Sequence, residues 1–148
     1  MNASRLLMIA VVVVLISVVT VASLNVVQYN ITSRGMIHIV TLGVEAFWDE
    51  NCTDPVTDVD WGILKPSDAR TVSFYLKNTG NTPVVLSMTT REWTPSTSEQ
   101  YMDLAWDAEN ATITEGAVLG VKMTLSVSPD ISGITDFEFT IIITGGET

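Results

Sequence analysis

Five carboxylates lie close together in the loop from Asp49 to Asp60. They fall within twelve residues and are Asp49, Glu50, Asp54, Asp58 and Asp60. Carboxylate oxygens are the ligands that hard cations such as Ca²⁺ prefer, so these side chains are candidates for a calcium site. Their spacing does not follow the D-x-[DN]-x-[DN]-G pattern of an EF-hand loop, and Asp is also an ordinary turn residue. The alternative is a solvated connecting loop, and we expect no other cofactor.

The chain holds few of the side chains that catalysis uses. His38 and Cys52 are its one histidine and its one cysteine. We find no G-x-S-x-G elbow, no Gly-rich phosphate loop and no Cys/His metal spacing in the sequence. Two carboxylates suffice for glycoside hydrolysis, but acid-rich loops alone do not indicate it. We therefore expect a protein without enzymatic activity, in which His38 is a sheet residue.

Three N-glycosylation sequons begin at Asn30, Asn51 and Asn110. Each can be modified only where the chain is exported and exposed, and we expect a glycan on at least one of them. Cys52 lies inside the second sequon and, as the single cysteine, cannot form an internal disulfide. In an oxidising exterior it would be buried, free, or joined to another molecule by an intermolecular disulfide.

The apolar segment from Leu6 to Leu24 has nineteen residues without charge, Gly or Pro. As a helix it would be about 28 Å long, which matches the hydrocarbon core of a bilayer. Arg5 precedes the segment and the next charge, Arg34, comes well after it, so the N-terminus is expected in the cytoplasm and the rest outside. The alternative is a signal peptide cleaved after Ala22 or Ser23, although the segment exceeds a typical signal core.

The exported part, residues 25–148, is strongly acidic. It has 124 residues, enough for one domain with a core, and carries a formal net charge of −11 from 17 acidic and six basic residues. This charge excludes nucleic acid as a partner, favours solubility and repels anionic lipid headgroups. The expected partners are the membrane, through residues 6–24, and other envelope proteins or further copies of the chain.

Residues 25–35 predict an extended segment. Val27, Tyr29 and Ile31 lie on one face of it, and Ser33 to Gly35 would form a turn or hinge after it. In one interpretation the segment is a membrane-proximal stalk or the first strand of the same domain. In the other it is a donor strand that completes the sheet of a neighbouring subunit.

Residues 36–148 show the two-residue alternation of β-strands, with turn residues between strands and no helical period. An apolar series from Met36 to Trp48 changes phase, which a bulge near Gly43 or a strand that changes sheet would explain. A hairpin is expected at Asn78 to Pro83, and the last strand leaves a sheet edge without an evident partner. The fold class is all-β, a two-sheet antiparallel sandwich of about seven strands after one N-terminal transmembrane or signal helix. Inward-facing series are predicted at Val72, Phe74 and Leu76; Val84, Leu86 and Met88; Met102, Leu104 and Trp106; alternate residues from Leu119 to Val127; and Phe137, Phe139, Ile141 and Ile143.

Several stretches resemble a known type of domain: Trp61-Gly62-Ile63-Leu64-Lys65-Pro66, Val72 to Lys77, Asn78 to Pro83, and Ser126 to Phe139. Together they resemble the Ig-like ectodomain of small archaeal envelope proteins with one N-terminal membrane segment. The resemblance covers residues 44–145 and implies an Ig-like fold, with Trp61 in a loop and packed on the sandwich. It implies little about activity. The layout is also similar to donor-strand fibre subunits, the TasA-like and archaeal bundling-pilus proteins, in which residues 25–32 would be the donor.

The sequence therefore predicts a non-enzymatic cell-envelope protein in three parts: residues 1–24 as tail and membrane helix, 25–35 as stalk or donor strand, and 36–148 as an extracytoplasmic Ig-like domain for structural or adhesive interaction. If the signal is cleaved, the alternative is a secreted subunit that polymerises into a filament through residues 25–32. A third interpretation is a surface module that binds calcium or glycans through the acidic loop and exposed aromatics such as Trp93 or Tyr101.

Overall fold

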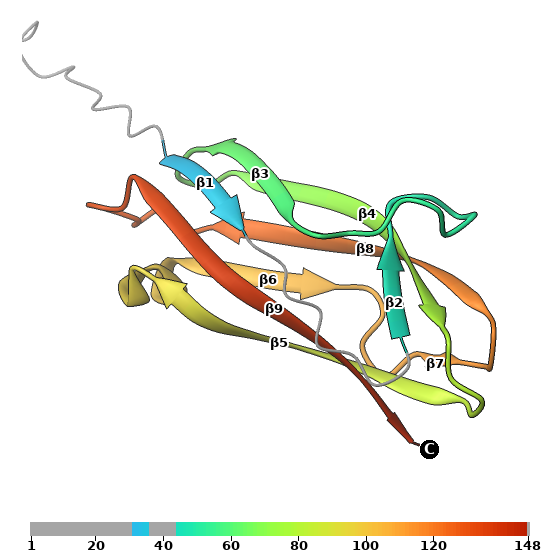
Figure 1. The fold of residues 1–148 in the computed structure, drawn as a ribbon. Helices are drawn as coiled ribbons and strands as arrows, with labels where there is room; N and C mark the ends of the chain where they lie inside the picture. The colour runs from blue at the N-terminus through green and yellow to red at the C-terminus, as the bar shows by residue number, and fades with distance from the viewer. Residues whose placement is uncertain (1–30, 36–43, 148) are drawn as a thin grey trace, which may run out of the picture.

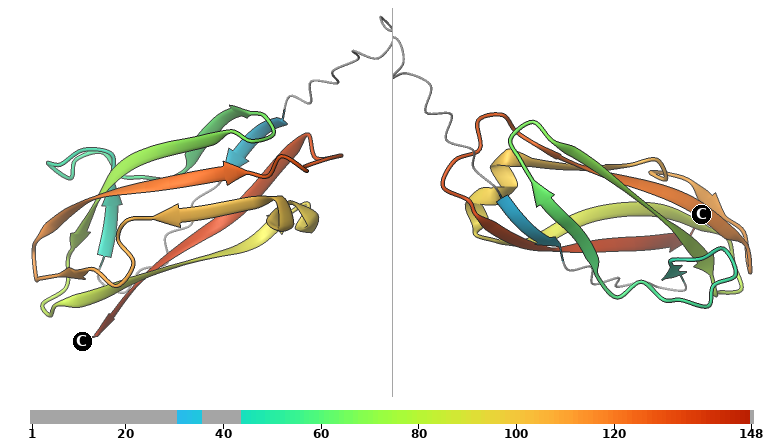
Figure 2. Two further views of the ribbon diagram at one scale, coloured as in Figure 1. Left: turned by 180° about the vertical axis from the view of Figure 1, so that it is seen from behind. Right: turned by 90° about the horizontal axis from the view of Figure 1, so that it is seen from above.

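The computed structural model describes residues 31–35 and 44–147 of the chain. Two β-sheets pack face to face, as Figures 1 and 2 show. One short 3₁₀ helix, η1 (Ser96–Tyr101), joins them. The strands are β1 (Ile31–Gly35), β2 (Val44–Phe47), β3 (Val59–Leu64), β4 (Ala69–Asn78), β5 (Val84–Thr94), β6 (Met102–Trp106), β7 (Thr112–Ile113), β8 (Val118–Val127) and β9 (Asp136–Glu147).

The five-stranded sheet has the order β3-β1-β9-β5-β7, and the four-stranded sheet has the order β2-β4-β8-β6. The predicted all-β, two-sheet architecture is confirmed. The described residues form nine strands rather than about seven, because β3 and the two-residue β7 lie in stretches expected to be loops. The sheets are also not purely antiparallel, since β1 pairs in parallel with β9.

The core lies between the sheets and is filled by the alternating residues of the long strands. Phe74 and Leu76 of β4 and Val121, Met123 and Leu125 of β8 are at most 2% exposed. On the facing sheet, Phe139, Ile141 and Ile143 of β9 are equally enclosed. Each such side chain contributes about 1.5–3 kcal/mol by leaving water, so the alternation is enough to fix which face of each strand turns inward. The inward-facing series predicted for these strands is confirmed.

The turn from Asn78 to Pro83 is not a hairpin. β4 pairs with β2 and β8, whereas β5 pairs with β7 and β9, so the turn carries the chain from one sheet to the other. The completely buried side chain of Asn78 holds it, donating from Nδ2 to the carbonyls of Thr82 (2.8 Å) and Ile113 (3.0 Å). The Asn78 Oδ1 accepts the N–H of Gly80 at 2.9 Å. The hairpin prediction was wrong because turn composition does not reveal whether the flanking strands pair.

The last strand, β9, is an interior strand and not an edge. It pairs with β5 along most of its length and with β1 at its beginning, where Ser33 lies opposite Phe137. The turn or hinge predicted at Ser33 to Gly35 is also wrong, because these residues belong to β1. The pairing that the sequence left unexplained is therefore supplied by the first described strand.

Trp61 is completely buried in β3, so its predicted packing role is confirmed, but its segment is a strand and not a loop. Gly62, which follows it, has φ +65°, a left-handed conformation that Gly adopts at little cost. A Cβ at this position would also collide with the guanidinium Nη1 of Arg70 on β4. Gly62 thus lets β3 turn its backbone and lets the Arg70 side chain lie against it.

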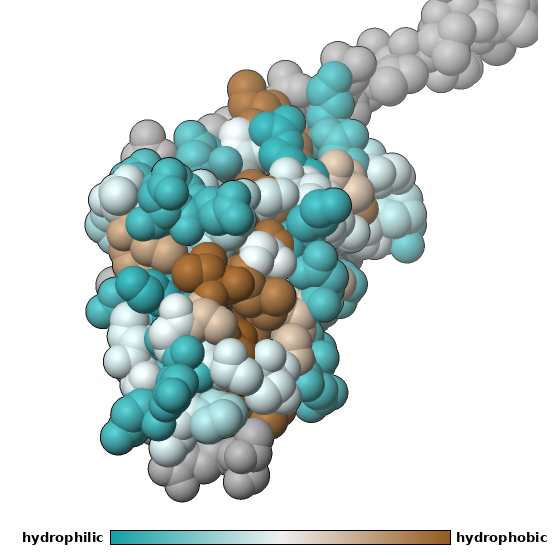
Figure 3. All heavy atoms as spheres, turned by 90° about the vertical axis from the view of Figure 1, so that its right-hand side faces the viewer, coloured by the Kyte–Doolittle hydropathy of each residue, from teal (hydrophilic) through white to brown (hydrophobic). Residues whose placement is uncertain are grey.

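The two ends of the sandwich differ. β1 begins at one end, where β3 finishes and β4 starts, while the β4–β5 turn and the C-terminus lie at the other end (Figure 1). Figure 3 views the molecule from that second end and shows apolar residues in the middle of the face, surrounded by hydrophilic ones. In the described part of the chain, the exposed large apolar side chains are Ile63, which is 58% exposed, and Val118, which is 39% exposed.

Candidate functional site

The short strand β1 lies inside the five-stranded sheet, between β3 and β9. Ile31 and Thr32 lie opposite Leu64 and Ile63 in an antiparallel ladder, and the register shifts between Ser33 and Gly35. On its other side β1 runs parallel to β9, with Thr32 opposite Asp136. If β1 were removed, β3 and the start of β9 would both lose a neighbour and expose their backbone N–H and C=O groups. We call the space between β3 and β9 the strand slot.

Of the three predicted donor-strand residues, the structure describes Ile31, which lies in the strand slot. Ile31 is the first residue of β1, while Val27 and Tyr29 are outside the described residues. The pairing segment therefore extends further along the chain than predicted, to Gly35. No local signal marks its partner on β9, because Asp136 and Phe137 stand near the opposite end of the sequence.

An aromatic stack supports the start of β9. The Trp93 ring on β5 lies 4.0 Å from that of Phe139, with 13° between their planes, and 6.3 Å from that of Phe137. All three rings are at most 8% exposed. Trp93 Nε1 donates to Thr90 Oγ1 at 3.2 Å, so its polar group is satisfied inside the stack. Trp93 is thus a core residue, and its predicted role as an exposed glycan-binding aromatic is wrong; Tyr101, the second candidate, is half-buried.

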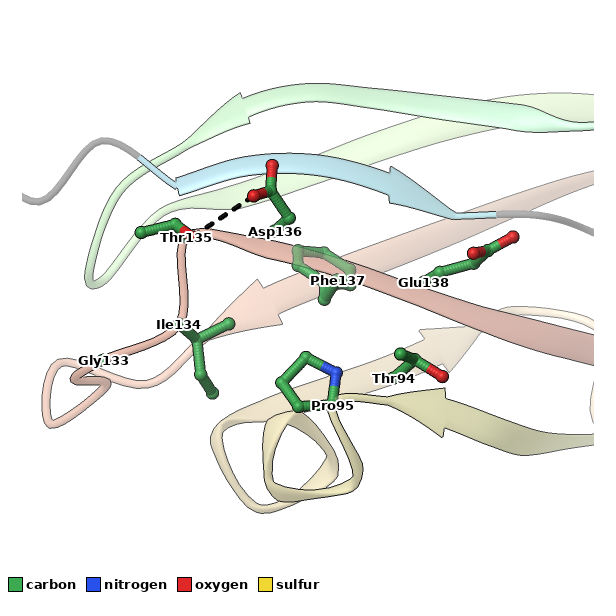
Figure 4. Close-up of a pocket in the computed structure, with 8 residues that line it drawn as sticks. All are labelled: Thr94, Pro95, Gly133, Ile134, Thr135, Asp136, Phe137 and Glu138. Carbon is green, nitrogen blue, oxygen red and sulfur yellow. Dashed lines mark hydrogen bonds between the residues drawn. The ribbon is translucent and has the colours of Figure 1, made fainter.

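A groove of about 660 Å³ follows the beginning of β9, beside the strand slot (Figure 4). Asp136, Phe137 and Glu138 succeed one another along β9, and Pro95 and Ile134 lie on the side away from β1. The two carboxylates are exposed, and Asp136 Oδ2 accepts a hydrogen bond from the Thr135 hydroxyl at 3.2 Å. Among the residues that the structure describes, the lining offers the hydroxyls of Thr94 and Thr135 and the carboxylates of Asp136 and Glu138. Such a lining can donate hydrogen bonds to a bound polar group and accept them from it.

The carboxylates of the acidic loop do not converge on a common metal-binding position in the described part of the chain. Within residues 31–35 and 44–147, no three His, Cys, Asp or Glu side chains are grouped so that they could hold a metal ion. Local hydrogen bonds instead engage three of the five predicted ligands. Asp49 accepts from Thr53 and Asp54, Asp58 accepts from the Thr57 hydroxyl, and Asp60 accepts the N–H of Gly62. Glu50 and Asp54 are exposed on the same loop.

Asp49 organises the turn that follows it. Its Oδ1 accepts the N–H of Asp54 at 2.8 Å and that of Thr53 at 2.9 Å, and its Oδ2 accepts the Thr53 hydroxyl at 2.9 Å. The Asp54 amide is the largest of the influences that lower the pKa of the Asp49 carboxyl below its ordinary value; the Thr53 groups add to it, and desolvation opposes them. The carboxylate therefore acts as a structural acceptor in this loop.

The sequons that the structure describes are accessible. Asn51 and Asn110 are both exposed, and both sit in or beside turns. Asn110 has φ +61°, a conformation that Asn tolerates, and its N–H donates to the Leu86 carbonyl at 3.0 Å. The third sequon residue, Asn30, lies outside the described residues.

Cys52 is half-buried beside Asn51 and has φ +56°. Its thiol donates to the Glu50 carbonyl at 3.6 Å. Neither full burial nor a bridge to a second molecule is shown for this thiol, so the intermolecular disulfide stays a prediction.

The apolar segment 6–24 and His38 also lie outside the described residues. Among the residues that are described, no helix is long and apolar enough to cross a membrane. Comparison with known protein families and with curated proteins finds no match for this chain.

Proposed function

We propose that this protein is a non-enzymatic, membrane-anchored envelope protein that presents an Ig-like sandwich outside the cell for structural or adhesive interaction. The observation that carries the proposal is the position of β1. Only seven residue steps separate Leu24, the end of the apolar segment, from Ile31, the first residue of β1. Even fully extended, seven steps span at most about 25 Å. A retained anchor therefore keeps the β1 end of the sandwich close to the bilayer.

The opposite end then becomes the part of the domain that a partner meets first. It carries the β4–β5 turn and the exposed Asn110, whose backbone is bonded to Leu86 near the start of β5. The Thr79 to Pro83 side of the turn is exposed throughout. Exposed polar loops held by a rigid two-sheet scaffold are common places for recognition.

Cysteine labelling on intact cells tests the topology. In a Cys52→Ser background, Asn81→Cys places a thiol on the exposed β4–β5 turn, and Ser4→Cys places the matched control thiol in the N-terminal tail. We expect a membrane-impermeant maleimide to label Asn81→Cys on intact cells and Ser4→Cys only after permeabilisation. Labelling of Ser4→Cys alone on intact cells would overturn the proposed orientation. An intact mass of the protein from its own membranes reports whether residues 1–24 remain and whether a glycan is attached.

A second candidate function is a filament subunit, and the strand slot favours it. A five-residue strand at an interior position can be supplied by its own chain or by the same segment of a neighbour, because the backbone ladder is identical in both cases. This segment begins seven residues after Leu24, so signal cleavage after Ala22 or Ser23 would leave it near a new N-terminus.

A disulfide trap separates the two arrangements. Thr32 and Ile63 lie opposite each other in β1 and β3, so Thr32→Cys/Ile63→Cys in the Cys52→Ser background can form a bridge across the slot. After oxidation, a monomer with an internal bridge shows that each chain fills its own slot. A covalent ladder of multimers, absent from the Thr32→Cys single variant, shows donation between subunits.

A further inference from the structure

The connection from β3 to β4 is unusual in this acidic domain. Residues 63–70, which we call the β3–β4 corner, carry Lys65 and Arg70 against one acidic residue, Asp68, a formal net charge of +1. The Lys65 and Arg70 side chains are exposed. The full chain has a formal net charge of −10, so this corner is a local reversal of sign.

The acidic groups of this region are turned toward the backbone. Asp68 Oδ2 accepts the N–H of Lys65 at 2.9 Å, and the Asp68 N–H donates to the Lys65 carbonyl at 3.0 Å. Asp60 likewise accepts the N–H of Gly62 at 2.8 Å. The corner is thus a tight turn whose one carboxylate, Asp68, accepts a backbone N–H, while its two cations lie on the surface.

The corner also exposes an apolar side chain. Ile63, just before Lys65, is 58% exposed, the larger of the two values found for exposed large apolar residues in the described part of the chain. The Arg70 guanidinium lies against β3 at Gly62, next to Ile63. An exposed aliphatic side chain flanked by Lys and Arg is chemically complementary to the headgroup region of an anionic bilayer, because the cations can meet the phosphates and the aliphatic group can enter the interface.

The position of the corner determines what lies opposite it. Leu64 and Ile63 pair with Ile31 and Thr32, so the corner sits where β1 enters the sandwich. By the proposed anchoring, this point is at most about 25 Å from the hydrocarbon boundary, and the headgroup layer itself covers about 5–8 Å of that distance. The corner is therefore within reach of lipid headgroups whenever the anchor is in place.

We propose that the β3–β4 corner is a membrane-docking surface that binds anionic lipid headgroups and orients the sandwich on the bilayer. The inference rests on the proposed function, since it needs the retained anchor. The remaining acidic surface, including Asp130 and Asp136 at the same end of the sandwich, is repelled by the lipid. Asp136 lies in the same row of the sheet as Ile63, through Thr32, but two strands further in, so docking by the β3 edge keeps it about 10 Å farther from the bilayer and fixes one rotation of the domain about its stalk. Each cation near an anionic surface strengthens docking by roughly fivefold.

Quenching by brominated lipid tests the docking. The full chain with Cys52→Ser and Ala69→Cys carries a fluorophore on the corner, and the matched chain with Asn81→Cys carries it at the opposite end. Both are placed in nanodiscs of brominated phosphatidylcholine mixed with phosphatidylglycerol. We expect strong quenching at position 69, little at position 81, and a loss of at least about half of the former at about 0.5 M NaCl, where screening shortens the reach of charges.

Charge reversal separates the corner from general electrostatics. Lys65→Glu/Arg70→Glu should reduce quenching at position 69 by about half or more, and Ile63→Ser should reduce it to a lesser degree. Lys77→Glu/Lys122→Glu is the matched control, because these lysines lie on β4 and β8 away from the corner. Thermal unfolding of each variant confirms that the sandwich remains folded. Equal quenching at positions 69 and 81 in the inserted chain, or equal effects of the two double variants, would overturn the docking alone. Loss of residues 1–24 from the native protein would overturn the anchoring and the docking together.

Discussion

Asn78 joins the two sheets through Ile113. The Nδ2 of Asn78, at the end of β4, donates to the carbonyl of Ile113 in β7 at 3.0 Å, across 35 positions of sequence. The same side chain closes the β4–β5 turn through Thr82 and Gly80. One fully buried amide therefore fixes the place where the chain passes between the sheets.

Replacing this amide should be costly. Asn78→Ala leaves the buried carbonyl of Ile113 without its donor and removes two further hydrogen bonds, so we expect a loss of about 2–4 kcal/mol in the free energy of unfolding. Asn81→Ala, on the exposed part of the same turn, should change it by less than about 0.5 kcal/mol. Urea denaturation measures both. Similar values for the two variants would show that the Asn78 bonds do not hold the turn.

Trp93 should be among the most sensitive positions of the core, because its ring covers both Phe137 and Phe139. Trp93→Ala is expected to cost about 3–5 kcal/mol, and Trp93→Phe, which retains a ring to stack, clearly less. Trp106→Ala serves as the comparison, since Trp106 is half-buried and bonded to Glu109 at the surface. Thermal unfolding followed by near-UV circular dichroism would report the order, and a cost for Trp106→Ala as large as that for Trp93→Ala would contradict it.

Gly62 and Gly116 are two substitution sites with the same backbone conformation but different surroundings. Both have a left-handed φ, +65° and +68°, but a Cβ at Gly116 would meet no atom within 4 Å, whereas one at Gly62 would meet Arg70. Alanine should cost about 1–2 kcal/mol at each through backbone strain. Gly62→Ala should cost somewhat more than Gly116→Ala, and the excess should vanish in an Arg70→Ala background, because the guanidinium must otherwise move. If Gly62→Ala still costs more than Gly116→Ala in the Arg70→Ala background, the difference comes from backbone strain and not from contact with the guanidinium.

The Asp49 turn should loosen in acid. Because its hydrogen bonds hold the pKa of Asp49 below the unfolded value, the carboxylate stabilises the folded turn above the ordinary Asp pKa of about 3.9. That contribution is lost as the pH falls through the lower, folded pKa. Hydrogen exchange of the Thr53 and Asp54 amides, corrected for its intrinsic pH dependence, should lose protection over this acidic range. Asp49→Asn should remove the pH dependence, and retention of it in this variant would assign the effect to another carboxylate.

The local features of the fold could be predicted from the sequence, and the long-range ones could not. Alternation along Val72 to Leu76 or Phe137 to Ile143 is enough to identify a strand and its inner face, because burial acts residue by residue. The β3 strand was missed because Gly62 interrupts the alternation with a left-handed residue. The position of β1 has no local signature, since it depends on β9, which is made last.

For the candidate site, too, the sequence predicts local features better than long-range ones. The exposure of Asn51 and Asn110 agrees with their position in turn sequences. The carboxylates that are close in sequence do not form a metal-binding cluster among the described residues. Asp49 and Asp60 instead accept hydrogen bonds from backbone N–H groups near them in the chain. The cations of the β3–β4 corner were visible in the sequence as Lys65 and Arg70, but their setting depends on the pairing of β3 with β1.

The contact between the first described strand and the last has a consequence for biogenesis. If the domain is exported as proposed, Ser33 emerges long before Phe137, so β1 would at first have only β3 to pair with. Until export is complete, the position of β1 in the sheet of such a molecule would be open, and its β1 could pair with the same position in a neighbouring molecule. The rate of export and the local concentration of the protein would then determine how often strands exchange between molecules. A chaperone that covers the open position would reduce this exchange.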